Sequence, residues 1–348
     1  GVSGWYSLIT GWRPSYIETT GYIINTFFDV AEHYSIPEYK DRAAQMANFL
    51  LDMQLPSGAY RVYTPQQNIS EKVVVFDMGQ DLLGMVHAYE VTKEKKYFVS
   101  AVAAAQYLLS IQESDGTWIK NTYGNTFHTY HTRVAWGILR VFEVTQSKQF
   151  KVAALKNLRW AQKQQLKNGW FLNNQLPLPN PQVPYTHTIS YAIEGFLWSG
   201  LLLNDPSLIQ TALRGAVPLL NHYLEHDFLP ATFDKNWNSD DRYSCLTGNA
   251  QISHMWLELY KITQDKRFLF GAKRMNAYLK SIQNISSKFK AIQGAIAGSN
   301  PIYGDLFRNR GYCRMAYLNW ATKFFIDALL EEEKIRQRET IHTITKTA

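Results

Sequence analysis

The order of apolar and polar positions divides the chain into alternating helical segments. In residues 39–53 and 96–111, alanine and leucine recur at i, i+3, i+4 and i+7, which is typical of a helix with one buried stripe. Another kind of segment, such as AIEGFLWSGLLL at 192–203, is apolar almost all round and indicates a helix buried on both sides. Strand-type alternation is scarce, so the pattern predicts an all-α protein.

The predicted helices form two sets that alternate along the chain. The set that is apolar all round covers residues 18–34, 77–91, 130–144, 187–203, 247–262 and 312–332. The amphipathic set covers residues 39–53, 96–111, 149–164, 207–222 and 267–282. This alternation is expected of helical hairpins that place one helix inside and its partner outside.

Two kinds of turn recur at regular intervals. The turns YEVTKEKKYF (89–98), FEVTQSKQF (142–150) and YKITQDKRF (260–268) give a repeat of about 53–59 residues, which fits one helical hairpin. The stretches QLPSGAY (54–60), QESDGTW (112–118) and QQLKNGW (164–170) end amphipathic helices. We expect Gln112 to close the helix end, Gly116 to supply the turn and Trp118 to pack or to line a cavity.

A closed ring of such hairpins is the (α/α)6 toroid, which we predict for a single domain at 1–332. Six inner and five outer helices are visible. Because the opening GVSGWYSLITGW looks like the loop after an outer helix, we expect either a missing outer helix before Gly1 or an eleven-helix ring closed by the tail after Glu331. Residues 333–348 are expected to be a frayed or disordered tail. The long irregular stretches at 170–186, 224–246 and 284–311 are expected to form rims or lids.

Composition favours a ligand with sugar-like rings and an acidic character. The chain is 46% hydrophobic and has 10 Trp and 21 Tyr, which suits a large core and an aromatic binding surface. The net charge is +7 and dispersed, so it favours an acidic substrate in a cationic cavity. Without a basic stripe or recognition motif, nucleic acid is not an expected partner.

Several chemistries lack their motifs. The two cysteines, Cys245 and Cys313, are far apart, and there is no HExxH, GxxxxGK[ST], GxGxxG or GxSxG sequence. We therefore predict no metal and no cofactor. No apolar run reaches the length of a membrane span and no signal peptide is visible, which favours the cytoplasm of a bacterium. The chain begins at Gly1 rather than Met, so a preceding segment stays open, as does the oligomeric state.

Candidate site residues lie where the inner helices begin, because helix N-termini at one end of a ring face a common cavity and favour anions. These candidates are Arg13, Tyr16, Glu18, Asp77, Gln80, Asp81, Tyr123, His128, His131, Arg133, His187, Tyr191, Glu194, Asn249, Gln251, Asp305, Arg308 and Tyr312, with Trp118 and Trp170 as further aromatic contacts.

Ordinary structural roles compete with some of these assignments. Asp77 and Glu18 lie where acids are favoured at helix N-termini in any protein. Glu194 is different, because a carboxylate in the middle of a buried helix costs several kcal/mol unless it is paired. Either the site or a structural ion pair must explain it. Three histidines at equivalent ends of the ring favour at least one in the site.

Three functions remain open at this point. The leading hypothesis is proton abstraction from a uronate, giving C5 epimerisation or β-elimination, with His128 or His187 as base, Tyr191 as acid, and Asn249 and Arg133 on the substrate carboxylate. The second is glycoside hydrolysis by two carboxyl groups ~5–5.5 or ~6.5–9.5 Å apart, chosen from Glu18, Asp77, Asp81, Glu194 and Asp305. The third is a catalytically silent ring that binds a glycan.

Several stretches together resemble a bacterial family with a terpenoid-cyclase/prenyltransferase-like toroid, often encoded beside surface-polysaccharide biosynthesis genes. They include TTGYI (19–23), FDMGQDLLG (76–84), FHTYHTRVAWGIL (127–139) and LNWATKFFIDAL (318–329). The resemblance implies the toroid and a glycan substrate, but no particular reaction. More distantly, MGQDLLGMVHAYEVT resembles the helical domain of glucuronyl C5-epimerases and other toroidal carbohydrate enzymes. QESDGTW resembles the QW repeats of terpene cyclases, yet their DxDD acid motif and the prenyltransferase zinc set are absent, which argues against terpenoid chemistry.

Overall fold

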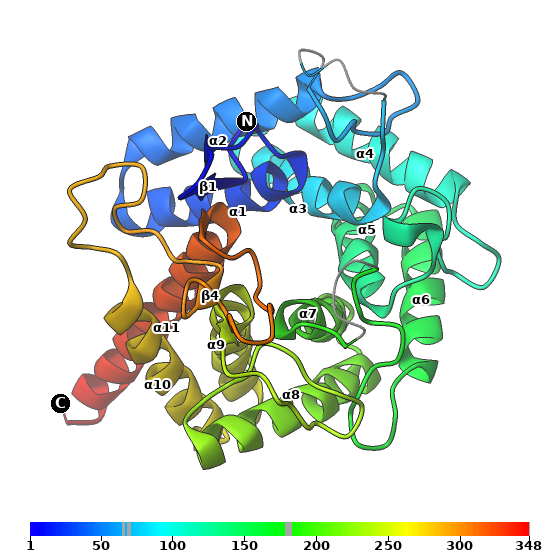
Figure 1. The fold of residues 1–348 in the computed structure, drawn as a ribbon. Coiled ribbons are helices and arrows are strands. Elements are labelled where there is room, and N and C mark those ends of the chain that lie inside the picture. Colours follow the sequence, from blue (N-terminus) through cyan, green and yellow to red (C-terminus); the bar gives the residue numbers. More distant parts are fainter. Residues whose placement is uncertain (65–66, 68–70, 178–182, 348) are drawn as a thin grey trace.

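The helices form two concentric rings around a central axis (Figure 1). The computed structural model describes residues 1–64, 67, 71–177 and 183–347. In these residues the inner ring consists of α1 (Ile17–Tyr34), α3 (Val75–Thr92), α5 (Thr132–Thr145), α7 (Thr186–Leu203), α9 (Leu246–Thr263) and α11 (Asn319–Thr347). The outer ring consists of α2 (Pro37–Asp52), α4 (Lys95–Ser110), α6 (Lys148–Lys163), α8 (Pro206–His226) and α10 (Lys266–Ile282). The predicted all-α toroid is confirmed.

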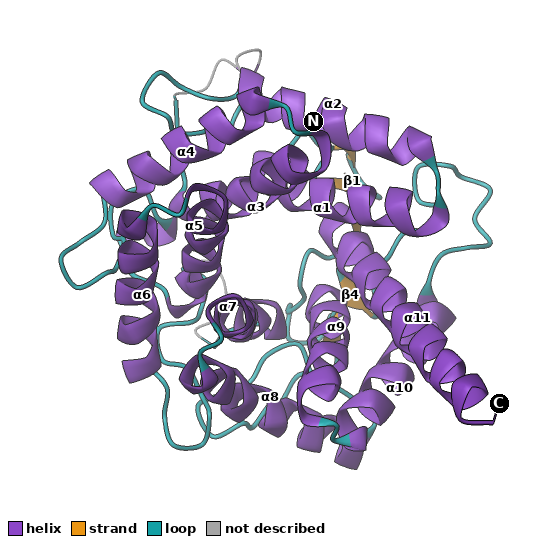
Figure 2. Cartoon of the chain, turned by 180° about the vertical axis from the view of Figure 1, so that it is seen from behind, coloured by secondary structure: helices purple, strands orange, loops and turns teal. Residues whose placement is uncertain are grey.

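Neighbouring inner helices pack side by side, and α11 returns to pack against α1 (Figures 1 and 2). Each outer helix packs against the inner helix that precedes it, as the hairpin repeat predicts. The outer helices present alanine stripes such as Ala101, Ala104 and Ala105 to the core, where all three are buried. The ring is therefore held by an amphipathic outer layer on a nearly apolar inner one.

The last inner helix begins later than predicted. Residues 312–318 were expected to be helical, but α11 starts at Asn319 and Ala316–Leu318 form the strand β5. β5 pairs with β1 (Trp5–Ser7), which pairs in turn with β2 (Gly11–Trp12), all antiparallel. A short apolar run fits strand and helix equally well, so periodicity could not separate them. A further pair, β3 (Ser244–Cys245) and β4 (Ser299–Asn300), joins two of the long loops.

Glycines allow the inner helices to approach closely. A Cβ atom on Gly84 of α3 would lie 2.1 Å from the carbonyl oxygen of Gly21 in α1. A Cβ atom on Gly137 of α5 would lie 2.5 Å from the carbonyl oxygen of Gly79 in α3. Both clashes are with backbone, which cannot move aside as a side chain does. These glycines set the spacing of the inner ring.

We expect Gly84→Ala to destabilise the fold by about 1–3 kcal/mol, because α1 and α3 must move apart to admit the methyl group. Gly215→Ala in α8 is the matched control, since the three atoms nearest to its Cβ would all belong to side chains, at 3.0–3.2 Å. The free energy of unfolding in urea measures both. Equal stability changes in the two variants would contradict this account of the packing.

The recurring glutamine stretches fasten successive outer helices together. Gln112 Nε2 donates to the carbonyl oxygens of Gly116 and of Ala153 in α6, each at 3.0 Å. Gln54 and Gln165 make the same pair of bonds to their own turns and to α4 and α8. Gly116 has φ of 95°, as the turn requires. The stretches therefore close helix ends, as expected, and also bridge to the next repeat.

α11 extends through Thr347, so the helix covers most of the predicted tail at 333–348, and fraying there stays a prediction, as does the single-domain boundary. None of the helices in the described part of the chain combines the length and the apolar character that crossing a membrane requires.

Candidate active site

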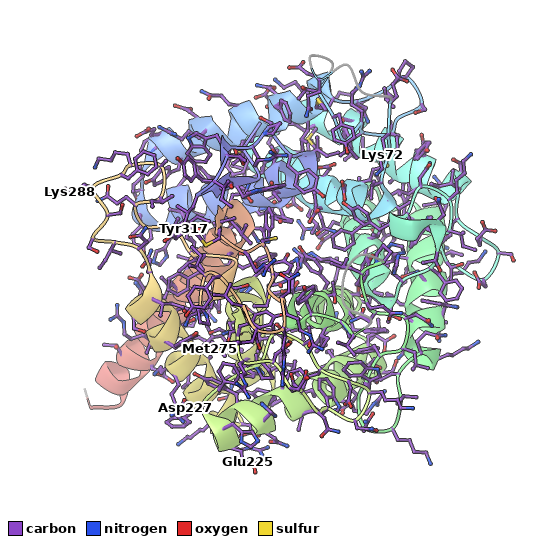
Figure 3. All side chains as sticks on the ribbon, in the orientation of Figure 1. Lys72, Glu225, Asp227, Met275, Lys288 and Tyr317 are labelled. Carbon is purple, nitrogen blue, oxygen red and sulfur yellow. The ribbon has the colours of Figure 1, made fainter. Side chains whose placement is uncertain are left out.

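A cavity of about 330 Å³ opens at the end of the ring where the inner helices begin. Side chains project into the middle of the ring and occupy much of the space between the ribbons (Figure 3). The lining comes from the starts of α1, α3, α7 and α11 and from the segments before α5, α7 and α11. The segment before α5 includes the short helices η2 (Tyr123–Asn125) and η3 (Thr129–His131). The described lining residues are Tyr16, Glu18, Thr19, Phe76, Tyr123, Tyr130, Leu176, Pro177, His187, Thr188, Tyr191, Tyr312 and Trp320.

Glu18 is the carboxyl group in this lining. Its Oε2 accepts a hydrogen bond from the Tyr16 hydroxyl at 2.7 Å, and its Oε1 lies 3.5 Å from the Tyr191 hydroxyl. Burial raises the pKa of Glu18 to about 7, although the bond from Tyr16 and the charge of Arg133 oppose the rise. Glu18 is therefore poised to gain or lose a proton near neutral pH.

Asp77 lies behind the lining and reaches Glu18 through two tyrosines. The Tyr123 hydroxyl donates to Asp77 Oδ1 at 2.9 Å, and the hydroxyls of Tyr123 and Tyr16 are 2.7 Å apart. Burial, followed by the nearby charge of Glu18, raises the pKa of Asp77 well above its usual value. The result is a continuous hydrogen-bonded chain that joins two carboxyl groups of the candidate set.

His187 enters the cavity in a defined tautomer. Its Nδ1 is 2.6 Å from Gln251 Oε1, and the amide nitrogen of Gln251 lies 3.4 Å from Glu194. An amide oxygen only accepts, so Nδ1 carries the proton and Nε2 keeps its lone pair. Burial lowers the pKa of His187 to about 4, which keeps the ring neutral at pH 7.

Arg133 of α5 and Glu194 of α7 form a buried ion pair outside the described lining of this cavity. Each side chain is 3% exposed. Arg133 also donates from Nε to Gln80 at 2.5 Å, and its guanidinium lies 5.0 Å from the Tyr191 ring centre. The structural ion pair expected as one explanation of Glu194 is thus present. Arg133, engaged on both sides, does not face the cavity as a ligand for a substrate carboxylate.

The other two candidate histidines pack rather than face the cavity. His128 Nε2 is 2.6 Å from the carbonyl oxygen of Tyr123, and its ring stacks on Tyr130 at 4.6 Å. His131 is buried against Trp118, and burial lowers its pKa well below the usual value. Neither belongs to the described lining, so this arrangement does not support a catalytic role for them.

Of the remaining acidic and amide candidates, some are buried between the helices and others belong to a surface loop. Asp81 is fully buried, and neither carboxyl oxygen has a hydrogen-bond partner in the described part of the chain. Asn249 is also buried, outside the lining. Asp305 accepts from the backbone amide of Arg308 at 3.1 Å, and the Arg308 guanidinium pairs with Asp240. These last residues organise a surface loop.

The remaining exposed and aromatic candidates also lie outside the cavity. Arg13 is exposed and lies over the Trp5 ring at 5.4 Å. Trp118 is fully buried and donates from Nε1 to the carbonyl oxygen of Leu108. Trp170 is buried against Trp237 at 5.1 Å between ring centres. These placements give a substrate-contact role no support.

Sequence reasoning missed seven of the described lining residues: Thr19, Phe76, Tyr130, Leu176, Pro177, Thr188 and Trp320. Four of them, Thr19, Phe76, Tyr130 and Thr188, are each adjacent in the sequence to a candidate that it did find. An aromatic residue beside a helix N-terminus would have been the signal, but the same residue type fills the core elsewhere. The described lining contains no Lys or Arg. Within the described residues, no three His, Cys, Asp or Glu side chains come together as potential metal ligands.

Comparison with known protein families and with curated protein sequences finds no match. Solved structures, in contrast, share the fold over nearly the full length. One is an unsaturated glucuronyl hydrolase specific for heparin, 15% identical, with a TM-score of 0.71 over 97% of this chain and 91% of that one. Another is the cellobiose 2-epimerase of Bacillus thermoamylovorans, 13% identical, with a TM-score of 0.71 over 95% and 92%. A third is a D-mannose isomerase, 14% identical, with a TM-score of 0.72 over 96% and 92%. At these identities, what the chain shares with such sugar-processing proteins is the α/α toroid fold.

Proposed function

We propose that the chain is a carbohydrate-active enzyme that hydrolyses a glycosidic bond in the central cavity. The observation that carries the proposal is the buried Glu18 carboxyl, which faces the cavity with a pKa of about 7. A carboxyl group that keeps its proton near neutral pH is the general acid that a departing glycosidic oxygen needs. The hydrolase, epimerase and isomerase names of the structural neighbours agree with a sugar substrate.

Asp77 supplies the second carboxyl group, acting through Tyr123. A water molecule in the cavity would give a proton to the Tyr123 hydroxyl as that hydroxyl gives its own to Asp77. The three hydrogen-bond distances in series hold Glu18 Oε2 and Asp77 Oδ1 closer than the ~9.5 Å upper limit for hydrolysis with inversion. The glycoside-hydrolase alternative of the sequence analysis therefore gains support.

The lining fits a sugar that stacks on aromatic side chains. This sugar carries no charge next to the bond that is cleaved. Tyr16, Phe76, Tyr312 and Trp320 offer apolar ring faces, which suit sugar rings. A uronate carboxylate at this position would meet Glu18, and the described residues of the lining include no Lys or Arg to balance it. Acidic units elsewhere along a polysaccharide agree with the net charge of +7.

His187 supports a second candidate function, proton abstraction from a sugar carbon. Its Nε2 is unprotonated because Gln251 holds the proton on Nδ1. Tyr191 neighbours it at 4.4 Å between ring centres, but burial raises the pKa of Tyr191 well above 10, so Glu18 is the better proton donor. Epimerisation of a neutral sugar would use His187 as base and Glu18 as acid.

We expect hydrolysis to decline as pH rises through about 7, because Glu18 must carry its proton to act as the acid. Above that pH, kcat/KM should fall about tenfold per pH unit. The measurement is the release of reducing ends, at pH 5 to 9, from neutral and uronate-containing oligosaccharides and from p-nitrophenyl glycosides. A profile without a decline up to pH 9 would contradict the role given to Glu18.

A further inference from the structure

We propose that Glu18 and Asp77 share a single proton along the chain Glu18–Tyr16–Tyr123–Asp77, so that the two carboxyl groups form one acid–base unit. Only the catalytic use of this unit rests on the proposed function. The sharing itself is a property of the free protein and follows from counting protons in the hydrogen-bonded chain.

The chain contains three oxygen–oxygen contacts at 2.7, 2.7 and 2.9 Å. At such distances each contact holds one proton between its two oxygens. The two phenols supply two protons, and they keep them because burial raises the pKa of both Tyr16 and Tyr123 well above 10. The third proton must come from a carboxyl group. Without it, two unprotonated lone pairs would face each other in one of the contacts.

One shared proton satisfies the chain in two arrangements. In the first, Glu18 is protonated and donates to Tyr16, Tyr16 donates to Tyr123, and Tyr123 donates to the Asp77 carboxylate. In the second, Asp77 is protonated and every bond runs in the opposite direction, ending on the Glu18 carboxylate. Each proton moves along one hydrogen bond, and the number of bound protons stays constant. A second carboxyl proton would add no hydrogen bond to the chain, because the buried Oδ2 of Asp77 has no described partner that could accept it.

This exchange closes the proton balance of the proposed hydrolysis. Glu18 turns its proton from Tyr16 toward the departing glycosidic oxygen and gives it to that oxygen as the bond from carbon to the oxygen breaks. The water oxygen forms the new bond to carbon, and the water proton passes through Tyr123 to Asp77. Reversal of the chain then returns a proton to Glu18, so the pair regains its first arrangement and the proton from the attacking water is the only one that it takes up.

The charged and titratable groups around Glu18 and Asp77 do not link the two carboxyl groups by hydrogen bonds in place of the two tyrosines. The cations that favour ionisation are Arg133 near Glu18 and Lys72 near Asp77. The other titratable groups around the pair, drawn from α1, α3, η3, α7 and α11 and their flanking segments, are Tyr22, Asp81, His128, Tyr130, His131, His187, Tyr191, Glu194, Tyr312 and Lys323. None of these is a link in the Glu18–Tyr16–Tyr123–Asp77 chain.

The test is a pH titration of the free protein by carbon-13 NMR, with glutamate labelled at the side-chain carboxyl. The Glu18 signal is identified by its loss in Glu18→Gln. In the wild type we expect it to shift in two separate pH steps, because Glu18 takes part in both titrations of the pair. In Tyr16→Phe the chain is cut at Glu18 Oε2, so we expect one dominant step, with only the small second shift that the charge of Asp77 still causes. Tyr123→Phe removes the link to Asp77 Oδ1 and should also shrink the second step, which keeps the test open if Tyr16→Phe fails to fold.

Tyr130→Phe is the matched control. Tyr130 lines the same cavity, but its hydroxyl has no hydrogen-bond partner in the described part of the chain, so two steps should remain. A single step in the wild type, or two steps of unchanged size in both Tyr16→Phe and Tyr123→Phe, would overturn the inference. Absence of hydrolysis would bear only on the proposed function, since the titration uses no substrate.

Discussion

Glu18→Gln is expected to lower kcat for glycoside hydrolysis by about 10²- to 10⁴-fold. The amide keeps the size of the side chain but has no proton to give to a departing oxygen. It can still contact Tyr16 and Tyr191, so substrate binding should change less than turnover. Initial rates of reducing-end release give kcat and KM separately, and KM should stay within a few-fold of the wild type.

The control for this variant lies on the same helix. Glu32 is exposed near the end of α1, away from the cavity. Glu32→Gln removes the same charge without touching the lining and should leave kcat unchanged. Equal activity of Glu18→Gln and the wild type would remove Glu18 from the mechanism, provided that thermal unfolding shows both proteins folded.

Arg133→Met is expected to destabilise the fold by about 3–5 kcal/mol. The substitution leaves the Glu194 carboxylate buried at 3% exposure without its cation. It also removes the bond to Gln80 and the guanidinium that lies among the rings of Tyr191 and Phe324. The free energy of unfolding in urea is the measurement. Replacing both partners, as Arg133→Met with Glu194→Leu, should recover a large part of the loss.

Arg140→Met is the matched control for the ion pair. Arg140 lies on the same helix and pairs with Glu90 and Glu143, but its side chain is 24% exposed. A partly exposed pair contributes only about 0–1 kcal/mol. Comparable losses in Arg133→Met and Arg140→Met would mean that burial does not set the strength of the Arg133–Glu194 pair.

Much of the fold could be predicted because its signal is local. The stripe of Ala101, Ala104 and Ala105 and the all-apolar inner segments mark outer and inner helices, and the observed bounds differ from the predicted ones by a few residues. The main exception is α11, whose predicted start included β5. Pairing of Tyr317 with Tyr6 decides that segment, and a partner more than 300 positions away leaves no trace in local periodicity.

The candidate site was predictable in its position and less so in its contacts. The starts of inner helices pointed to Glu18, Asp77 and His187, which the structure brings to one end of the ring. Arg133 has the right residue type for a substrate carboxylate, but its partners Gln80 and Glu194 come from α3 and α7. Only the folded structure shows that these two residues already bind the Arg133 guanidinium. Trp118 looks like a sugar platform in sequence because burial cannot be read from residue type alone.

The most direct test of glycoside hydrolysis is to run the reaction in deuterated, oxygen-18-labelled water and to examine the products by NMR and mass spectrometry. With an oligosaccharide that binds the protein, we predict a new reducing end that carries one oxygen-18 atom, with no deuterium on carbon, and loss of this product in Glu18→Gln. Deuterium on a sugar carbon without a new reducing end, an unsaturated product, or an unchanged ligand would contradict hydrolysis in the central cavity.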